Sequence, residues 1–150
     1  MIREFHKDEL DTVMQLWMNS VTKANPFIPR EYWLEQYRVV RNEHLSEAKT
    51  FVYGDHGRLK GFISILEDSF VGALFVDADN WGQGVGTKLV EWCQERYPHL
   101  ELSVYKENRK GVEFCKKCGF QIVREQMNSD SGKPELAMSW EKKDAKKAEA

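Results

Sequence analysis

The chain has 150 residues, the length of one domain, which is enough to bury a hydrophobic core. Its 22 basic and 24 acidic residues nearly balance, so net charge indicates neither nucleic acid nor a membrane surface as a partner. It has no signal-peptide pattern and no apolar run near the roughly 18 residues of a membrane helix, and its three cysteines argue against a disulfide framework. We expect a cytoplasmic globular protein, either a monomer or a homodimer.

The first half of the chain predicts a strand, two helices and two further strands. A weak alternation and two helical stripes place the first three elements at residues 1–5, 6–21 and 30–45. Pro26 and Pro29 interrupt the helices, and the apolar loop around them is either an elbow or one wall of a substrate pocket that includes Asn25 and Phe27. Strands then follow at 50–53 and 59–66, joined by a hairpin turn at 54–57.

The second half predicts a strand at 71–77, three alternating glycines and a helix along which Val85, Leu89 and Cys93 share one face. Gly119 is expected to close the second helix of this half in a left-handed conformation. The remaining elements are a strand at 100–105, a helix at 108–117 and strands at 120–127 and 135–140. We expect one domain over residues 1–141, and a charged tail at 142–150 without an apolar face, which predicts disorder.

The alternating glycines Gly82, Gly84 and Gly86 lie between a strand and a helix. A helix start has backbone N–H groups without partners and a partly positive dipole, so it binds anions. A Walker A loop is excluded because Lys88 stands one place too late, and the dinucleotide pattern is excluded because Thr87 stands where it requires glycine. The spacing therefore predicts a pyrophosphate cradle at residues 82–87, with a ligand-free turn as the alternative.

Two motifs carry a resemblance to one family. The pattern x-G-x-G-x-G after a strand that ends in Val-Asp resembles the coenzyme A loop of the GNAT (GCN5-related N-acetyltransferase) superfamily, Gln/Arg-x-x-Gly-x-Gly/Ala. The stretch N-R-K-G-V-E-F-C-K-K-C-G-F is similar to the family segment Asn-x-x-Ala-x-x-Phe-Tyr-x-x-x-Gly-Phe. The order β-α-α-β-β-β-α-β-α-β-β is also the family's, so the resemblance to its small bacterial members spans nearly the whole chain and implies an α/β (α+β) fold with a mixed, mostly antiparallel sheet flanked by helices.

The resemblance implies an acetyl-CoA-dependent N-acetyltransferase in which a primary amine of a protein, a peptide or a small molecule attacks the thioester directly, without a metal. The backbone of Leu74, Phe75 and Val76 would pair with the pantetheine arm like an added strand, and Asn108 would hydrogen-bond the arm. The pyrophosphate would be held by the loop residues Trp81, Gly82, Gln83, Gly84, Val85, Gly86 and Thr87.

Three positions depart from the family pattern. Trp81 replaces a glutamine or arginine, Cys115 stands where many relatives carry a tyrosine acid, and Ser103 stands where several carry a glutamate base. Cys115 is a candidate acid because its thiol and that of coenzyme A have similar ordinary pKa values, with Tyr105 as the alternative. Glu67 is the first candidate for the base and Glu101 the second.

Further expectations concern Phe70 and the cysteines. Phe70 would line the gap between the splayed central strands or simply belong to the core. Cys115 and Cys118 form a C-x-x-C at a helix end, where the dipole raises a thiol pKa, and no further ligands complete a zinc site.

Because the usual acid and base are missing, a non-catalytic sensor or scaffold that binds acetyl-CoA or CoA is the alternative function.

Overall fold

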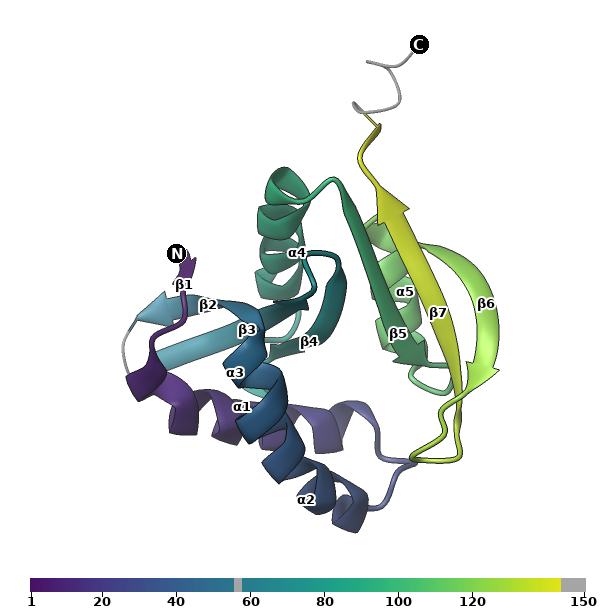
Figure 1. Ribbon diagram of the computed structural model, residues 1–150, viewed down its shortest axis with the longest axis horizontal. Helices are drawn as coiled ribbons and strands as arrows, with labels where there is room; N and C mark the ends of the chain where they lie inside the picture. Colours follow the sequence, from purple (N-terminus) through teal and green to yellow (C-terminus); the bar gives the residue numbers. More distant parts are fainter. Residues whose placement is uncertain (56–57, 144–150) are drawn as a thin grey trace.

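The computed structural model describes residues 1–55 and 58–143, and these form one seven-stranded sheet with helices on both faces (Figure 1). The strand order is β1-β2-β3-β4-β5-β7-β6, and only the β4–β5 pair is parallel. The strands are β1 (Ile2–Glu4), β2 (Lys49–Asp55), β3 (Arg58–Leu66), β4 (Phe70–Val76), β5 (His99–Tyr105), β6 (Gln121–Met127) and β7 (Pro134–Glu141). The predicted fold class is confirmed.

The helices also follow the predicted order, with irregular turns at their ends. They are α1 (Leu10–Ala24), α2 (Arg30–Val39), α3 (Leu45–Glu47), α4 (Val85–Arg96) and α5 (Arg109–Lys117). Single turns precede α1 (Lys7–Glu9) and α4 (Ala78–Asn80), and a π-helical segment, Val40–His44, joins α2 to α3. No helix in the described residues is long and apolar enough to cross a membrane.

Some predictions fall on residues outside the described part of the chain. The hairpin turn between β2 and β3 includes residues 56–57, and the predicted tail includes residues 144–150. The start of that tail is described: the backbone N–H of Lys142 donates to the carbonyl of Pro98, and its Nζ donates to the carbonyl of Glu95. Lys142 is therefore held against the end of α4.

Two hydrophobic cores lie on opposite faces of the sheet. Neighbouring residues of β3 show the division, because Phe62 packs with α1 and α2 whereas Ile63 packs with α4 and α5. Successive side chains of a strand point to opposite faces, so each helix pair covers one face. This arrangement buries β3 on both sides and fixes β4 beside it.

The parallel strands β4 and β5 separate soon after they meet. In the described chain they pair only at Phe70 and Glu101, next to a hydrogen bond of 2.8 Å from the N–H of Glu101 to the carbonyl of Ser69. Beyond this point the two strands diverge toward their carboxyl ends (Figure 1). The remaining length of β4 therefore has an edge that β5 does not pair.

Candidate functional site

The unpaired edge of β4 presents the backbone groups of Leu74 and Val76. The N–H of Asp77 donates to the carbonyl of Lys60, so Asp77 directs its backbone groups toward β3. In an antiparallel ladder the residues alternate in direction, so Phe75 also faces β3 while Leu74 and Val76 face the side left by β5. Leu74 and Val76 thus lie on the open edge, whereas the backbone groups of Phe75 face β3. The predicted pairing of this segment with the pantetheine arm stays a prediction.

The carbonyl of Val76 already has two hydrogen-bond donors. The Oγ of Ser20 on α1 donates to it over 3.1 Å, and the indole Nε1–H of Trp81 donates over 2.7 Å. Sequence reasoning missed Ser20, although a hydroxyl within the apolar stripe of α1 is a visible signal, and Ser20 is 2% exposed. Both side chains thus reach the end of β4 from neighbouring elements.

Two residues of the glycine loop adopt the left-handed conformation. Gly82 and Gly84 have φ of +80° and +79°, and no atom lies within 4 Å of the position where a Cβ would project. Such angles favour glycine. Gln83 lies exposed between them, so the loop presents backbone and one amide side chain to solvent.

The start of α4 offers unpaired backbone donors beside this loop. Gly84 precedes the helix and supplies no capping side chain, and the N–H of Lys88 makes the first helical bond, to the carbonyl of Gly84. The N–H groups of Val85, Gly86 and Thr87 therefore have no partner within the helix. No acidic residue lies in this first turn, so its partial positive charge is not compensated there.

A hollow of about 360 Å³ lies next to the loop, against α5. It is lined by Arg109, Lys110, Glu113, Phe114 and Lys117. The Phe114 ring approaches within 3.1 Å of the position of a Cβ on Gly86, which links the hollow to the start of α4. Three cationic side chains and one carboxylate give the hollow a positive balance that sequence reasoning did not assign to a ligand.

Asn108 occupies the N-cap of α5. Its Oδ1 accepts a hydrogen bond of 3.0 Å from the N–H of Gly111. This cap fixes the side chain, and Nδ2 is the donor that it leaves for a ligand. The predicted role toward the pantetheine arm stays a prediction that would use this Nδ2.

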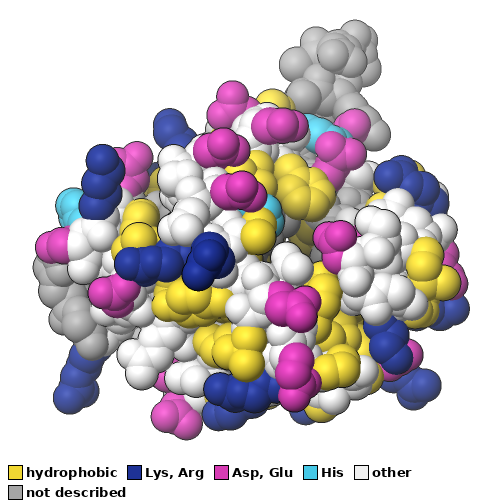
Figure 2. Space-filling view, turned by 60° about the horizontal axis from the view of Figure 1, so that its bottom comes forward, with side chains coloured by type: hydrophobic (Ala, Val, Ile, Leu, Met, Phe, Trp, Pro, Cys, Tyr) yellow, Lys and Arg dark blue, Asp and Glu magenta, His cyan; other side chains and the backbone are white. Residues whose placement is uncertain are grey.

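The α1–α2 loop lies against the end of β5 and the β6–β7 loop. The rings of Phe27 and Tyr105 pack edge to face with their centroids 5.8 Å apart. The Tyr105 hydroxyl donates a hydrogen bond to Oγ of Ser131. Asn25 is buried beside Phe27: its Nδ2 donates to the carbonyl of Val21, and its Oδ1 has no partner in the described part of the chain. Figure 2 brings the bottom of Figure 1 forward and shows hydrophobic side chains exposed across the middle of this face, with charged side chains among and around them.

Tyr32 joins this group and was not predicted. Burial is the main cause that raises the pKa of its phenol, and a hydrogen bond to Tyr105 and the negative charges of Asp130 and Glu135 raise it further. The Glu135 carboxylate is buried and accepts hydrogen bonds from two side-chain amides. The hydroxyl of Tyr32 is therefore a neutral donor on this side of the sheet.

The predicted catalytic residues lie apart from one another. Ser103 is exposed on β5, two residues beyond the Phe70–Glu101 pair, and Phe70 is 38% exposed at that pair. Glu67 lies in the turn before β4 with φ of +53°, on the other side of the pair from Leu74 and Val76. Glu67 is therefore not on the separated part of β4, because the turn that holds it precedes the point of separation.

Cys115 is 6% exposed within the core between α5 and the sheet. Burial raises the pKa of its thiol to about 12, and the neighbouring Cys118 adds to the rise. Such a rise disfavours Cys115 as an acid that matches coenzyme A, and its predicted catalytic role stays a prediction. Cys118 is also a free thiol, and the described residues contain no cluster of three or more side chains suited to a metal ion.

We expect Cys115→Ala to change turnover by less than about 3-fold, because a thiol with so high a pKa gives up its proton poorly to a thiolate whose ordinary pKa is about 8.5. Steady-state release of coenzyme A, with binding of acetyl-CoA measured in parallel, checks this result. A loss of about 100-fold in turnover with unchanged binding would instead make Cys115 the acid.

Comparisons with known proteins agree with this geometry. The sequence profile of the acetyltransferase (GNAT) family matches residues 10–120. The peptidyl-lysine N-acetyltransferase YiaC of Escherichia coli (strain K12) is 37% identical over 93% of this chain and 96% of that protein. The solution structure of apo-form YjaB from Escherichia coli superposes with a TM-score of 0.80 at 29% identity, covering 93% of this chain and 96% of that one. The PaiA N-acetyltransferase of Thermoplasma acidophilum in complex with coenzyme A shares the fold, with a TM-score of 0.75 at 17% identity over 95% and 98% of the two chains.

Proposed function

Because this chain belongs to the acetyltransferase (GNAT) family, we propose that it is an N-acetyltransferase that moves the acetyl group of acetyl-CoA onto lysine side chains of proteins or peptides. Two Escherichia coli relatives named peptidyl-lysine N-acetyltransferases support this acceptor class: by sequence alignment, YiaC is 37% identical and YjaB 34% identical to this chain. Acetylation of a protein N-terminus or of a small-molecule amine is the broader alternative.

The observation that carries the proposal is the unpaired edge of β4 next to the open donors of α4. Leu74 and Val76 offer N–H and C=O groups to an amide-containing arm, and the N–H groups of Val85, Gly86 and Thr87 suit a pyrophosphate. The cationic hollow beside Phe114 suits a further phosphate of the same ligand. Acetyl-CoA has these parts in the same order: a thioester, an amide arm, a pyrophosphate and a phosphorylated nucleoside.

The reaction we propose is direct attack within the part of the sheet where β4 and β5 separate. The lone pair of a neutral amine forms a bond to the thioester carbonyl carbon, and backbone N–H donors of β4 stabilise the oxyanion. The carbon–sulfur bond then breaks, the nitrogen loses a proton to water, and the departing thiolate takes one from water. Neither proton step uses Cys115 or Glu67, because the first is a weak acid and the second lies beyond the separated strands.

Acetylation of matched peptides tests this proposal. We expect acetyl-CoA and a peptide with one internal lysine and a blocked N-terminus to give coenzyme A and a singly acetylated lysine, detected by mass spectrometry. The same peptide with arginine in place of lysine is the control and should stay unmodified. If acetyl-CoA binds but no amine in a panel of peptides, polyamines and amino acids is acetylated, the protein is a sensor or scaffold.

A further inference from the structure

The indole of Trp81 occupies a backbone group that a ligand on β4 would need. Its Nε1–H lies 2.7 Å from the carbonyl oxygen of Val76, at the last residue of the unpaired edge. A carbonyl oxygen has two lone pairs, and Ser20 takes the other one over 3.1 Å. The carbonyl of Val76 is therefore fully used, although it faces the side on which an added strand would lie.

Ser20 and Trp81 differ in how easily each can give up its hydrogen bond to the carbonyl of Val76. Ser20 is 2% exposed on α1, packed between the helix and the sheet, whereas Trp81 is 45% exposed in the loop before α4. A buried hydroxyl that left the carbonyl would lose its partner without reaching water, which is costly. The exposed indole can exchange its hydrogen bond for one to solvent at little cost, so Trp81 is the donor that an incoming ligand displaces.

We propose that Trp81 stands in for an amide of the pantetheine arm, and that binding of the arm displaces its indole from Val76. The inference rests on the proposed use of acetyl-CoA. The arm carries two amides, each with one N–H and one C=O, and the edge of β4 offers two residues, Leu74 and Val76, with the same groups. In the ligand-free protein Trp81 thus donates a hydrogen bond to the carbonyl of Val76 at the end of β4. When coenzyme A binds, the indole leaves and the carbonyl accepts a hydrogen bond from the ligand instead.

The indole N–H resonance of Trp81 reports this exchange directly, and Trp81→Phe assigns it. We expect saturating coenzyme A to move this resonance and to speed the exchange of its proton with water, because the hydrogen bond to Val76 is lost. Trp17 and Trp33, which are buried, serve as internal controls and should not change. Adenosine 3′,5′-bisphosphate lacks the pantetheine arm and should leave the Trp81 hydrogen bond intact.

Affinity gives a second readout. Trp81→Phe keeps a ring but removes the competing donor, so coenzyme A should bind about 2- to 10-fold more tightly, the range of one neutral hydrogen bond, while adenosine 3′,5′-bisphosphate binds as before. Ser20→Ala removes only the donor on the buried side of the Val76 carbonyl and keeps Trp81, so coenzyme A should still move the Trp81 resonance.

The outcomes separate this inference from the function on which it rests. If wild type does not bind coenzyme A at all, the proposed function fails. Suppose instead that coenzyme A binds, that the Trp81 resonance stays where it is in the ligand-free protein, and that Trp81→Phe binds coenzyme A with the wild-type affinity. Then only the displacement of Trp81 is refuted. Weaker binding of coenzyme A by Trp81→Phe would also refute it, since the indole would then hold the ligand.

Discussion

Gly84→Val should abolish the rise in melting temperature that acetyl-CoA gives to the wild-type protein. Gly84 has φ of +79° and immediately precedes α4, with open space where its Cβ would project. A β-branched side chain disfavours this angle and would fill the space next to the N–H groups of Val85, Gly86 and Thr87. Loss of two charge-assisted hydrogen bonds to a phosphate corresponds to about 100-fold or more in affinity.

Gly132→Val is a matched control for this variant. Gly132 has φ of +73° in the β6–β7 loop, is exposed, and likewise has no atom within 4 Å of a Cβ. Valine at this position imposes the same backbone strain, but away from α4. Gly132→Val should therefore lower stability as Gly84→Val does, yet keep the rise in melting temperature that acetyl-CoA gives. Differential scanning fluorimetry and calorimetric titration of both variants compare them. A normal shift in Gly84→Val would place the pyrophosphate elsewhere.

The sequence was sufficient for the element order because its signals are local. Glycine and proline mark most of the breaks, and one-sided apolar stripes mark the helices, so each element was predictable from a short window. The predicted and observed ends of the helices differ where the last turn depends on contacts with neighbouring elements. The helix predicted at 30–45 continues as a π-helical segment and α3, a detail that its apolar stripe does not encode.

The site was predictable where it depends on backbone, and less so where it depends on side chains meeting across the fold. The three alternating glycines mark a loop at the start of a helix, and Gly82 and Gly84 there have positive φ. The hydrogen bond from Ser20 to Val76 joins residues 56 positions apart, so no local pattern reports it. The high pKa of Cys115 likewise comes from burial in the core, which a C-x-x-C spacing does not encode.

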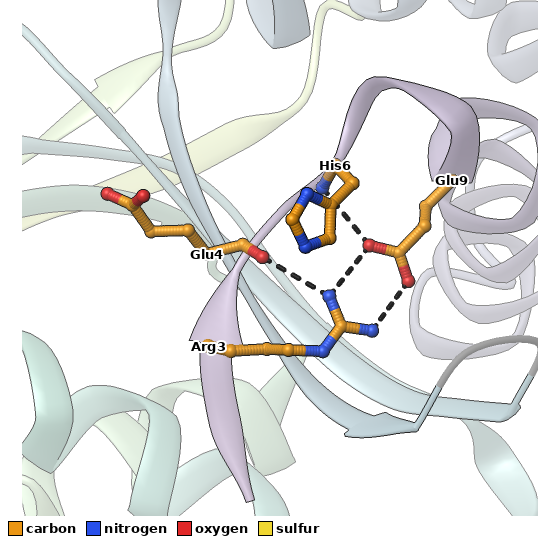
Figure 3. A network of polar contacts seen from close by, with 4 residues as sticks. All are labelled: Arg3, Glu4, His6 and Glu9. Atoms are coloured by element: carbon orange, nitrogen blue, oxygen red, sulfur yellow. Dashed lines mark hydrogen bonds and ion pairs between the residues drawn. The ribbon is translucent and has the colours of Figure 1, made fainter.

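A buried ion pair at the N-terminus should make a large contribution to stability. The Glu9 carboxylate is 4% exposed and accepts hydrogen bonds of 2.9 and 2.7 Å from Nη1 and Nη2 of Arg3, and a third from the N–H of His6 (Figure 3). These bonds tie β1 to the turn that begins α1. Arg3→Met removes the cation and leaves a buried negative charge, which typically costs about 3–5 kcal/mol. We expect about 3 kcal/mol, because Arg3 is partly exposed.

Urea denaturation measures this loss, and a second substitution tests its cause. Arg3→Met combined with Glu9→Gln has no charge at either position. The side-chain amide oxygen of the new glutamine can still accept the hydrogen bond from the N–H of His6. If loss of the cation beside the buried Glu9 carboxylate causes the destabilisation, the double variant should recover more than half of the free energy of unfolding that Arg3→Met alone loses. Equal losses in the two variants would mean that the Arg3 side chain stabilises the protein by packing, since charge removal at Glu9 would then make no difference.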